Sequence, residues 1–157
     1  MNNKKLNVSL ITAIFVMLLF NASIFAQKEK APKNNALDGK IFTIELKIEN
    51  TKKPKEPVPD ELIFKSAKFT SKEFLKDMFK ATVYDVEVDS SGVNKSYTFE
   101  VEQKNDKEEI LKWEGTIEFA DEETGYEIEG QCELTSKKGK LIERNSFTGT
   151  EKKKKKR

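Results

Sequence analysis

Carboxylates are the groups whose number and spacing first suggest chemistry in this sequence, because two converging carboxylates can hydrolyse a glycosidic bond. Here they recur instead at every second position of segments that alternate apolar and polar residues. Glutamate strongly prefers exposure, so this phase predicts a solvated outer face rather than a catalytic pair. The glutamates concerned are Glu45, Glu87, Glu100, Glu102, Glu114, Glu118, Glu127, Glu129 and Glu133.

No histidine occurs among the 157 residues. This absence removes Ser-His-Asp and Cys-His catalysis and the commonest protein ligand of transition metals. The seven glycines are scattered singly, so no phosphate-binding loop is present. Residues 121–123 are acidic but lack the spaced oxygen ligands of a calcium loop, which favours a plain acidic turn over a weak calcium site. We therefore expect no enzyme, no metal and no cofactor.

The sequence holds one cysteine, Cys132, which cannot form a disulfide within its own chain. It is in phase with Ile128 and Leu134 on a strand pattern, which favours a small buried apolar residue. A reactive thiol or a bridge to a second chain is the alternative.

Aromatic residues occupy the phase opposite to the glutamates and predict an aromatic-rich interior. They would be core if side chains fill that interior, and the lining of a ligand cavity if they do not. No basic residue lies on the same phase, so no clamp for a fatty-acid carboxylate is expected. The candidate ligand-binding residues are Trp113, Tyr97, Phe99, Tyr126, Phe42 and Tyr84.

Residues 1–26 have the pattern of a secretory signal peptide. Lys4 and Lys5 precede an apolar run over residues 10–20, which is about half of the roughly 20 residues that cross a bilayer. Cleavage after Ala26 is expected, with cuts after Ala22 or Ser23 as alternatives. The sequence thus predicts an exported protein, periplasmic or secreted, that is not an integral membrane protein once it is processed.

Three further segments follow the signal peptide. Residues 27–36 are polar and predict a flexible lead-in, residues 37–150 have the length of one domain, and residues 151–157 form a basic tail. The sequence has 29 basic and 27 acidic residues. The signal peptide and the tail together hold eight of the basic residues and one of the acidic residues, so residues 27–150 hold 21 basic and 26 acidic residues. This mildly acidic body argues against nucleic-acid binding.

The basic tail is expected to be disordered and solvated. Alternatively, it could contact anionic lipid headgroups or polyanionic envelope polymers, at roughly 1 kcal/mol per charge near a surface. Such an attraction would fade with salt. The residues that would make this contact are Lys152, Lys153, Lys154, Lys155, Lys156 and Arg157.

Period-two alternation between short turn signals predicts about eight antiparallel strands with nearest-neighbour connections. Such a chain favours an all-β up-and-down barrel, because closing the sheet removes its unpaired edges. A helical stripe with Ser71 as N-cap predicts one short helix over 71–80, and three prolines predict a loop over 49–60. The predicted strands are 41–48, 61–65, 67–70, 82–88, 96–103, 110–119, 126–134 and 141–148.

Gly115, Gly130 and Gly149 each follow a large inward residue by two positions. Glycine weakens a strand unless the sheet bends there or another group approaches closely. The three glycines therefore indicate sharply coiled strands, or else room for Trp113 or Phe147 across the interior.

The order of several short motifs resembles that of the small exported lipocalin-like domains of bacteria, which are similar to calycin barrels. This resemblance covers residues 37–150 and implies a barrel with a pocket for an apolar molecule, or a structural role in the envelope. Similar proteins often carry a cysteine after the second hairpin, whereas residues 71–74 of this chain contain none. The resemblance transfers no catalytic residues. The motifs are Leu37-Asp38-Gly39-Lys40-Ile41-Phe42, Asp60-Glu61-Leu62-Ile63-Phe64, Phe69-Thr70-Ser71, Trp113-Glu114-Gly115-Thr116, Ile128-Glu129-Gly130 and Phe147-Thr148-Gly149.

Two functional hypotheses follow. The first is an exported, monomeric, non-enzymatic lipocalin-like protein that binds a small apolar ligand in its mouth or interior. The second is a packed structural or interaction barrel of the cell envelope that contacts anionic partners through the basic tail.

Overall fold

The computed structural model describes residues 35–50 and 55–153, which belong to one compact unit, Lys33–Arg157. The expected signal peptide over 1–26, most of the lead-in and tail residues 154–157 lie outside the described residues, as do residues 51–54 of the predicted loop. Within the described ranges, the helix is one turn long, and no helix there has the length and apolarity to span a membrane.

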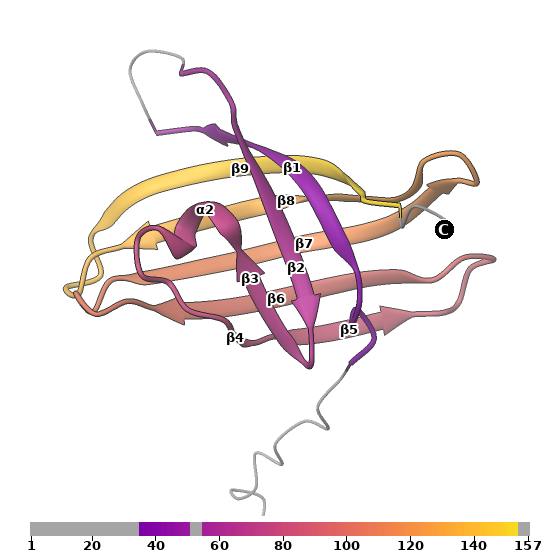
Figure 1. Ribbon diagram of the computed structural model, residues 1–157, viewed down its shortest axis with the longest axis horizontal. Coiled ribbons are helices and arrows are strands. Elements are labelled where there is room, and N and C mark those ends of the chain that lie inside the picture. Colours follow the sequence, from indigo (N-terminus) through magenta and orange to yellow (C-terminus); the bar gives the residue numbers. More distant parts are fainter. Residues whose placement is uncertain (1–34, 51–54, 154–157) are drawn as a thin grey trace, which may run out of the picture. The chain divides into compact units, whose positions relative to one another are not determined.

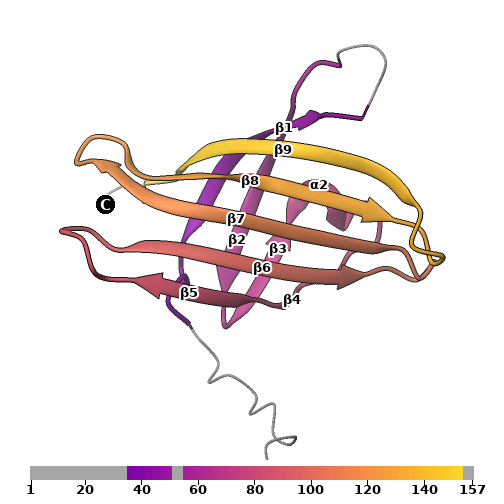
Figure 2. The same ribbon diagram turned by 180° about the vertical axis from the view of Figure 1, so that it is seen from behind.

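The described residues form a nearly closed antiparallel up-and-down barrel, which confirms the predicted fold class. β1, β2 and β3 cross one side of the barrel, and β6, β7 and β8 form the other (Figures 1 and 2). The order in the sheet is β4-β3-β2-β1-β9-β8-β7-β6-β5. The strands are β1 (Ile41–Ile48), β2 (Val58–Lys65), β3 (Lys68–Ser71), β4 (Thr82–Val83), β5 (Asp85–Asp89), β6 (Ser96–Lys104), β7 (Ile110–Asp121), β8 (Gly125–Thr135) and β9 (Leu141–Glu151).

The count of nine strands arises because the predicted strand 82–88 is divided at Tyr84. β4 pairs with β3, whereas β5 pairs with β6, so one stretch of chain changes its partner at the tyrosine. The buried Tyr84 side chain anchors this change, and its hydroxyl donates to a carboxylate oxygen of Asp38 at 3.1 Å. The same aspartate accepts from the Ala67 backbone N–H in the β2–β3 turn, at 2.9 Å. The barrel therefore nears closure where a single segment bridges its two sides.

Alternation along the strands separates a dry interior from a polar surface, as predicted. In β6, for example, Tyr97, Phe99 and Val101 are buried while Thr98 and Glu100 are exposed. Burial of a large apolar side chain stabilises a fold by about 1.5 to 3 kcal/mol, so this inward set supplies the main driving force. Its largest members are Trp113, Phe42, Phe64, Phe69, Phe79, Phe99, Phe147, Leu37, Ile44, Leu62, Leu111 and Ile117.

The prediction that the loop runs to residue 60 was wrong, because β2 begins at Val58 and contains a proline. Pro59 pairs with Glu45 of β1, while the pairing of β2 with β3 covers Leu62–Lys65. The position of Pro59 therefore lies beyond the β3 ladder, where a proline without an N–H is tolerated.

The predicted helix over 71–80 was too long. α2 spans Lys72–Leu75, with the expected N-cap, Ser71, whose hydroxyl accepts from the Phe74 N–H. Met78 has a φ of 68° and is 52% exposed, so the apolar stripe does not continue. The backbone turns back there, because the Met78 N–H donates to the Leu75 carbonyl oxygen at 3.1 Å and the Phe79 N–H donates to the Phe74 carbonyl oxygen at 3.2 Å.

The strand glycines mark places where backbones approach closely. A Cβ built on Gly130 would meet the Glu114 carbonyl oxygen and lie 2.7 Å from both the Gly115 Cα and the Phe147 ring. One built on Gly115 would lie 2.7 Å from the Glu129 carbonyl oxygen and from the Phe99 ring. The prediction that the glycines make room is thus confirmed for Phe147 at Gly130, whereas at Gly115 the room is used by Phe99 rather than Trp113.

Candidate functional site

Three of the candidate ligand-binding residues, Trp113, Phe42 and Phe99, are at most 1% exposed and lie among other rings. Ring centroids of Phe69 and Phe147 lie 5.2 and 5.5 Å from that of Trp113. The Trp113 indole N–H donates to Gln103 Oε1 at 3.1 Å, which fixes the indole in place. Side chains therefore occupy the space around these residues.

Phe64 joins the remaining inner rings to this cluster. Its centroid lies 6.1 Å from Phe42, 5.3 Å from Phe99 and 5.1 Å from Tyr84. Burial and the neighbouring Asp38 carboxylate raise the pKa of Tyr84 to about 12, so its hydroxyl stays protonated and serves as a donor. Phe64 is a central contact of the interior that was not among the candidates.

The other two candidates, Tyr97 and Tyr126, form a separate cluster with their ring centroids 5.9 Å apart. Phe119 extends this cluster at 5.6 Å from Tyr126. The Lys40 ammonium lies 3.8 Å from the Tyr126 ring centroid and pairs with Glu151 at 3.0 Å. Burial and the hydrogen bond with Tyr126 raise the pKa of Tyr97. The structure thus divides the six candidates into a packed centre and a partly exposed end cluster.

A buried polar network around Asp60 was missed, because the residue fell in the predicted loop. Asp60 accepts from the Ser71 hydroxyl at 2.5 Å and from the Glu73 backbone N–H at 2.8 Å. Its carboxylate thereby ties β2 to the first turn of α2. The signal was present in the sequence, because Asp60 continues the inward phase of Leu62 and Phe64.

Cys132 is fully buried, as predicted, and burial raises the pKa of its thiol to about 12. The Asn145 amide nitrogen contacts the sulfur at 3.8 Å. Because the thiolate is the reactive form, this environment argues for an inert thiol.

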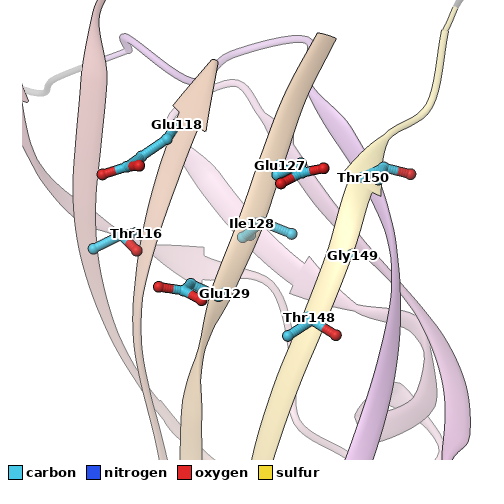
Figure 3. A pocket seen from close by; sticks show the side chains of 8 residues that line it. All are labelled: Thr116, Glu118, Glu127, Ile128, Glu129, Thr148, Gly149 and Thr150. Atoms are coloured by element: carbon cyan, nitrogen blue, oxygen red, sulfur yellow. The ribbon is translucent and has the colours of Figure 1, made fainter. Parts of the chain in front are cut away.

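Open space appears on the outside of the barrel, over β7, β8 and β9. Two adjoining hollows of about 410 and 530 Å³ share Thr116, Glu129 and Thr148 in their walls. We call them together the outer groove. Figure 3 shows two rows across the three strands, one of Glu118, Glu127 and Thr150 and the other of Thr116, Glu129 and Thr148. The outer groove is lined by Thr98, Glu114, Gly115, Thr116, Glu118, Glu127, Ile128, Glu129, Gly130, Gln131, Ser146, Phe147, Thr148, Gly149 and Thr150.

The charge of the outer groove comes from Glu114, Glu118, Glu127 and Glu129, which are all exposed. Among the described residues none of the four forms an ion pair, and neither do Glu45, Glu87 and Glu100, whereas Glu102 and Glu133 do. Glu133, for example, pairs with Arg144 at 2.6 Å. Within residues 35–50 and 55–153, the carboxylates of the outer groove therefore have no ion-pair partner.

Lys152 and Lys153 follow directly after β9, and Lys153 reaches the turn between β7 and β8. Lys152 and Lys153 are exposed, and Lys152 pairs with Glu61 at 2.7 Å. Hydrogen bonds from Lys152 and then Lys72 lower the pKa of Glu61. The Lys153 ammonium donates to the Glu122 carbonyl oxygen at 3.3 Å, in the turn that joins β7 to β8. Strand β9 runs to Glu151, three residues beyond the predicted end of the last strand at residue 148.

The described residues bring together no group of three or more His, Cys, Asp or Glu side chains that could hold a metal ion. Comparison with known proteins adds no relative, because no family model, no curated protein and no solved structure matches this chain.

Proposed function

We propose that this protein is a non-enzymatic interaction barrel of the cell envelope, which contacts anionic partners through its basic residues 152–157. The packing of the interior carries this proposal. Trp113, Phe64 and Phe69 are fully buried and in ring contact with their neighbours, which leaves the outside as the surface for binding. The export of the protein rests on the signal-peptide pattern of residues 1–26.

The separation of charge supports a role for the tail. Residues 27–150 carry five more acidic than basic residues, so the body would be repelled by an anionic surface. Residues 152–157 are all basic and follow directly after β9. Anionic surfaces would therefore be met by the tail first, with the acidic body turned away.

The experiment measures binding of the chain from Gln27 to vesicles of phosphatidylglycerol and phosphatidylcholine, compared with vesicles of phosphatidylcholine alone. In the test variant, Lys154, Lys155, Lys156 and Arg157 are replaced by Gln. In the control, Lys65, Lys68, Lys138 and Lys140 are replaced by Gln, which removes the same charge from the body.

At roughly 1 kcal/mol per charge, the tail variant should bind anionic vesicles at least a hundredfold more weakly at low salt. The control should retain most of its affinity, and raising the salt should weaken binding of the unchanged chain. Equal losses in both variants, or no binding by the unchanged chain, would reject the proposal.

A second candidate function, binding of a small apolar ligand, is favoured by the end cluster of Tyr97, Phe119 and Tyr126. Phe119 and Tyr126 are half-buried, so an apolar molecule could extend the cluster without entering the packed centre. Titration with a panel of lipids and hydrophobic dyes, read from the fluorescence of Trp113 and of the tyrosines, tests this function. A panel without any saturable change counts against it.

A further inference from the structure

The outer groove is a hollow in the sheet that the described chain leaves uncovered. The backbone of Gly115, Gly130 and Gly149 contributes to its surface, and outward threonines and glutamates stand around it. Neighbouring strands of a sheet lie about 4.8 Å apart, so their outward side chains form rows across the sheet. An extended segment can lie along such a row. The groove therefore has the form of a docking site for a short stretch of chain.

The charges of this groove call for a cationic occupant. Glu118 and Glu127 lie directly opposite each other on β7 and β8, an arrangement of like charges that destabilises a sheet. Glu129 lies two residues along β8 from Glu127, on the same face. No described lysine or arginine forms an ion pair with these three carboxylates. A segment with several ammonium groups would relieve the repulsion.

The chain itself supplies such a segment within reach. The Lys153 ammonium already contacts the Glu122 carbonyl oxygen, and Lys154-Lys155-Lys156-Arg157 follow. Four extended residues cover about 13 Å. The same distance separates residues four apart on a strand, such as Glu118 and the edge of the turn at Glu122. Thr150 lies opposite Glu127, so Lys153 follows that row by three residues, about 10 Å of extended chain. Four basic residues that turn back from Lys153 therefore span the distance to Glu118 and Glu127.

We propose that residues 154–157 dock in the outer groove of their own chain, with their cationic groups between Glu118, Glu127 and Glu129. One consequence rests on the function proposed above. A docked tail is withheld from anionic partners, so the groove and the anionic surface compete for the same four cations.

Docking is tested without any partner, by the amide NMR shifts of Thr116, Thr148 and Thr150. The unchanged chain is compared with the variant in which residues 154–157 are replaced by Gln. We expect shift differences at these groove amides that disappear in 0.5 M NaCl and are the same at every protein concentration. No difference would overturn the proposal, and so would a difference that grows with concentration, because a second copy would then be the occupant.

Competition is tested by vesicle binding of the variant Glu118→Gln, Glu127→Gln and Glu129→Gln. The control variant Glu45→Gln, Glu87→Gln and Glu100→Gln has the same net charge and also alters exposed strand positions. The groove variant should bind anionic vesicles several-fold more tightly than the control, and equal affinities would overturn the competition. If the groove shifts appear but the unchanged chain binds no vesicle, docking stands and the proposed function falls. If vesicle binding depends on residues 154–157 but the groove shifts are absent, the function stands and docking falls.

Discussion

The two faces of strands β7, β8 and β9 have the same backbone but opposite states of completion. On the inner face, Trp113 and Cys132 are fully buried, and the polar Asn145 beside them donates to the Glu143 carboxylate at 2.9 Å. On the outer face, Glu118 and Glu127 oppose each other without a cation among the described residues. The inner face is thus packed and its polar groups are hydrogen-bonded, whereas the outer face has carboxylates that no described cation pairs with.

This difference bears on which positions determine stability and which are available for binding. A buried position is fixed by its neighbours, because vacant volume or an unpaired polar atom costs free energy there. An exposed carboxylate can remain unpaired at little cost, because water solvates it. Substitutions on the two faces should therefore differ in size and even in sign.

The largest effect is expected inside, for Trp113→Ala. Removing the indole leaves a cavity among Phe69, Phe74 and Phe147 and deprives Gln103 of a donor. The free energy of unfolding should fall by about 3 to 5 kcal/mol in urea titrations. The fully exposed Val93 provides the control, since Val93→Ala should change stability by less than about 0.5 kcal/mol. A mild loss at Trp113 would mean that the centre is not packed as described.

The next largest loss of stability is expected for Gly130→Ala, in the strand backbone between the two faces. The added methyl group would meet the Glu114 carbonyl oxygen and the Gly115 Cα, and backbone atoms cannot move aside as a flexible side chain does. We expect a loss of about 1 to 3 kcal/mol in thermal or urea unfolding. Gly92→Ala is the matched change, because its Cβ would make an ordinary contact 3.5 Å from the Asn94 carbonyl oxygen. Similar losses at both glycines would contradict the close approach of β7 and β8.

A smaller effect is expected from the buried thiol at alkaline pH. Folding raises the pKa of Cys132 from 9.0 to about 12, so the folded state keeps a proton that the unfolded state releases. This stabilisation is complete below about pH 9 and is lost as the pH rises towards 12. At pH 10 the free energy of unfolding should have fallen by about 1 kcal/mol. Urea titrations at pH 8 and pH 10 should show a steeper loss for the unchanged chain than for Cys132→Ala. Tyr84 acts in the same direction in both proteins, so equal slopes would place the thiol in a more solvated site.

The smallest effect is expected outside, for Glu118→Gln made in the chain whose residues 154–157 are already replaced by Gln, so that no docked tail contributes. Removing one of two opposed charges should leave stability unchanged or raise it by a few tenths of a kcal/mol. At Glu133 the same substitution breaks the pair with Arg144 and should lower stability by up to about 1 kcal/mol. Thermal melts at low salt give the sign of each change. A loss at Glu118 as large as that at Glu133 in this background would show that Glu118 has a cationic partner other than residues 154–157.

The sequence was sufficient for the fold wherever one face is dry. Alternation in residues 96–103 and 110–119 predicted β6 and β7 to within two residues at each end, because each inward position needs an apolar side chain. The helix after Ser71 was overextended, since the apolar pattern does not reveal that Met78 takes a positive φ and ends the turn.

The candidate site was less predictable than the fold. The inward phase identified Trp113 and Phe99 but could not decide between core and cavity lining, because that depends on how rings from distant strands meet. The outer groove depends on the register that sets Glu118 against Glu127, and a single strand does not carry that information. The three strand glycines were the available signal, and they point to the correct strands.

The change of partner at Tyr84 makes one part of the ring much shorter than the rest. β3 and β4 meet through the pairs Lys68↔Val83 and Phe69↔Thr82, whereas β7 and β8 are paired from Ile110 to Asp121. Amide hydrogens near this seam should exchange with solvent sooner than those in β7 and β8, because fewer bonds must break to release them. Local opening of the barrel would then begin between β3 and β4. The pairing of β7 with β8 would remain intact.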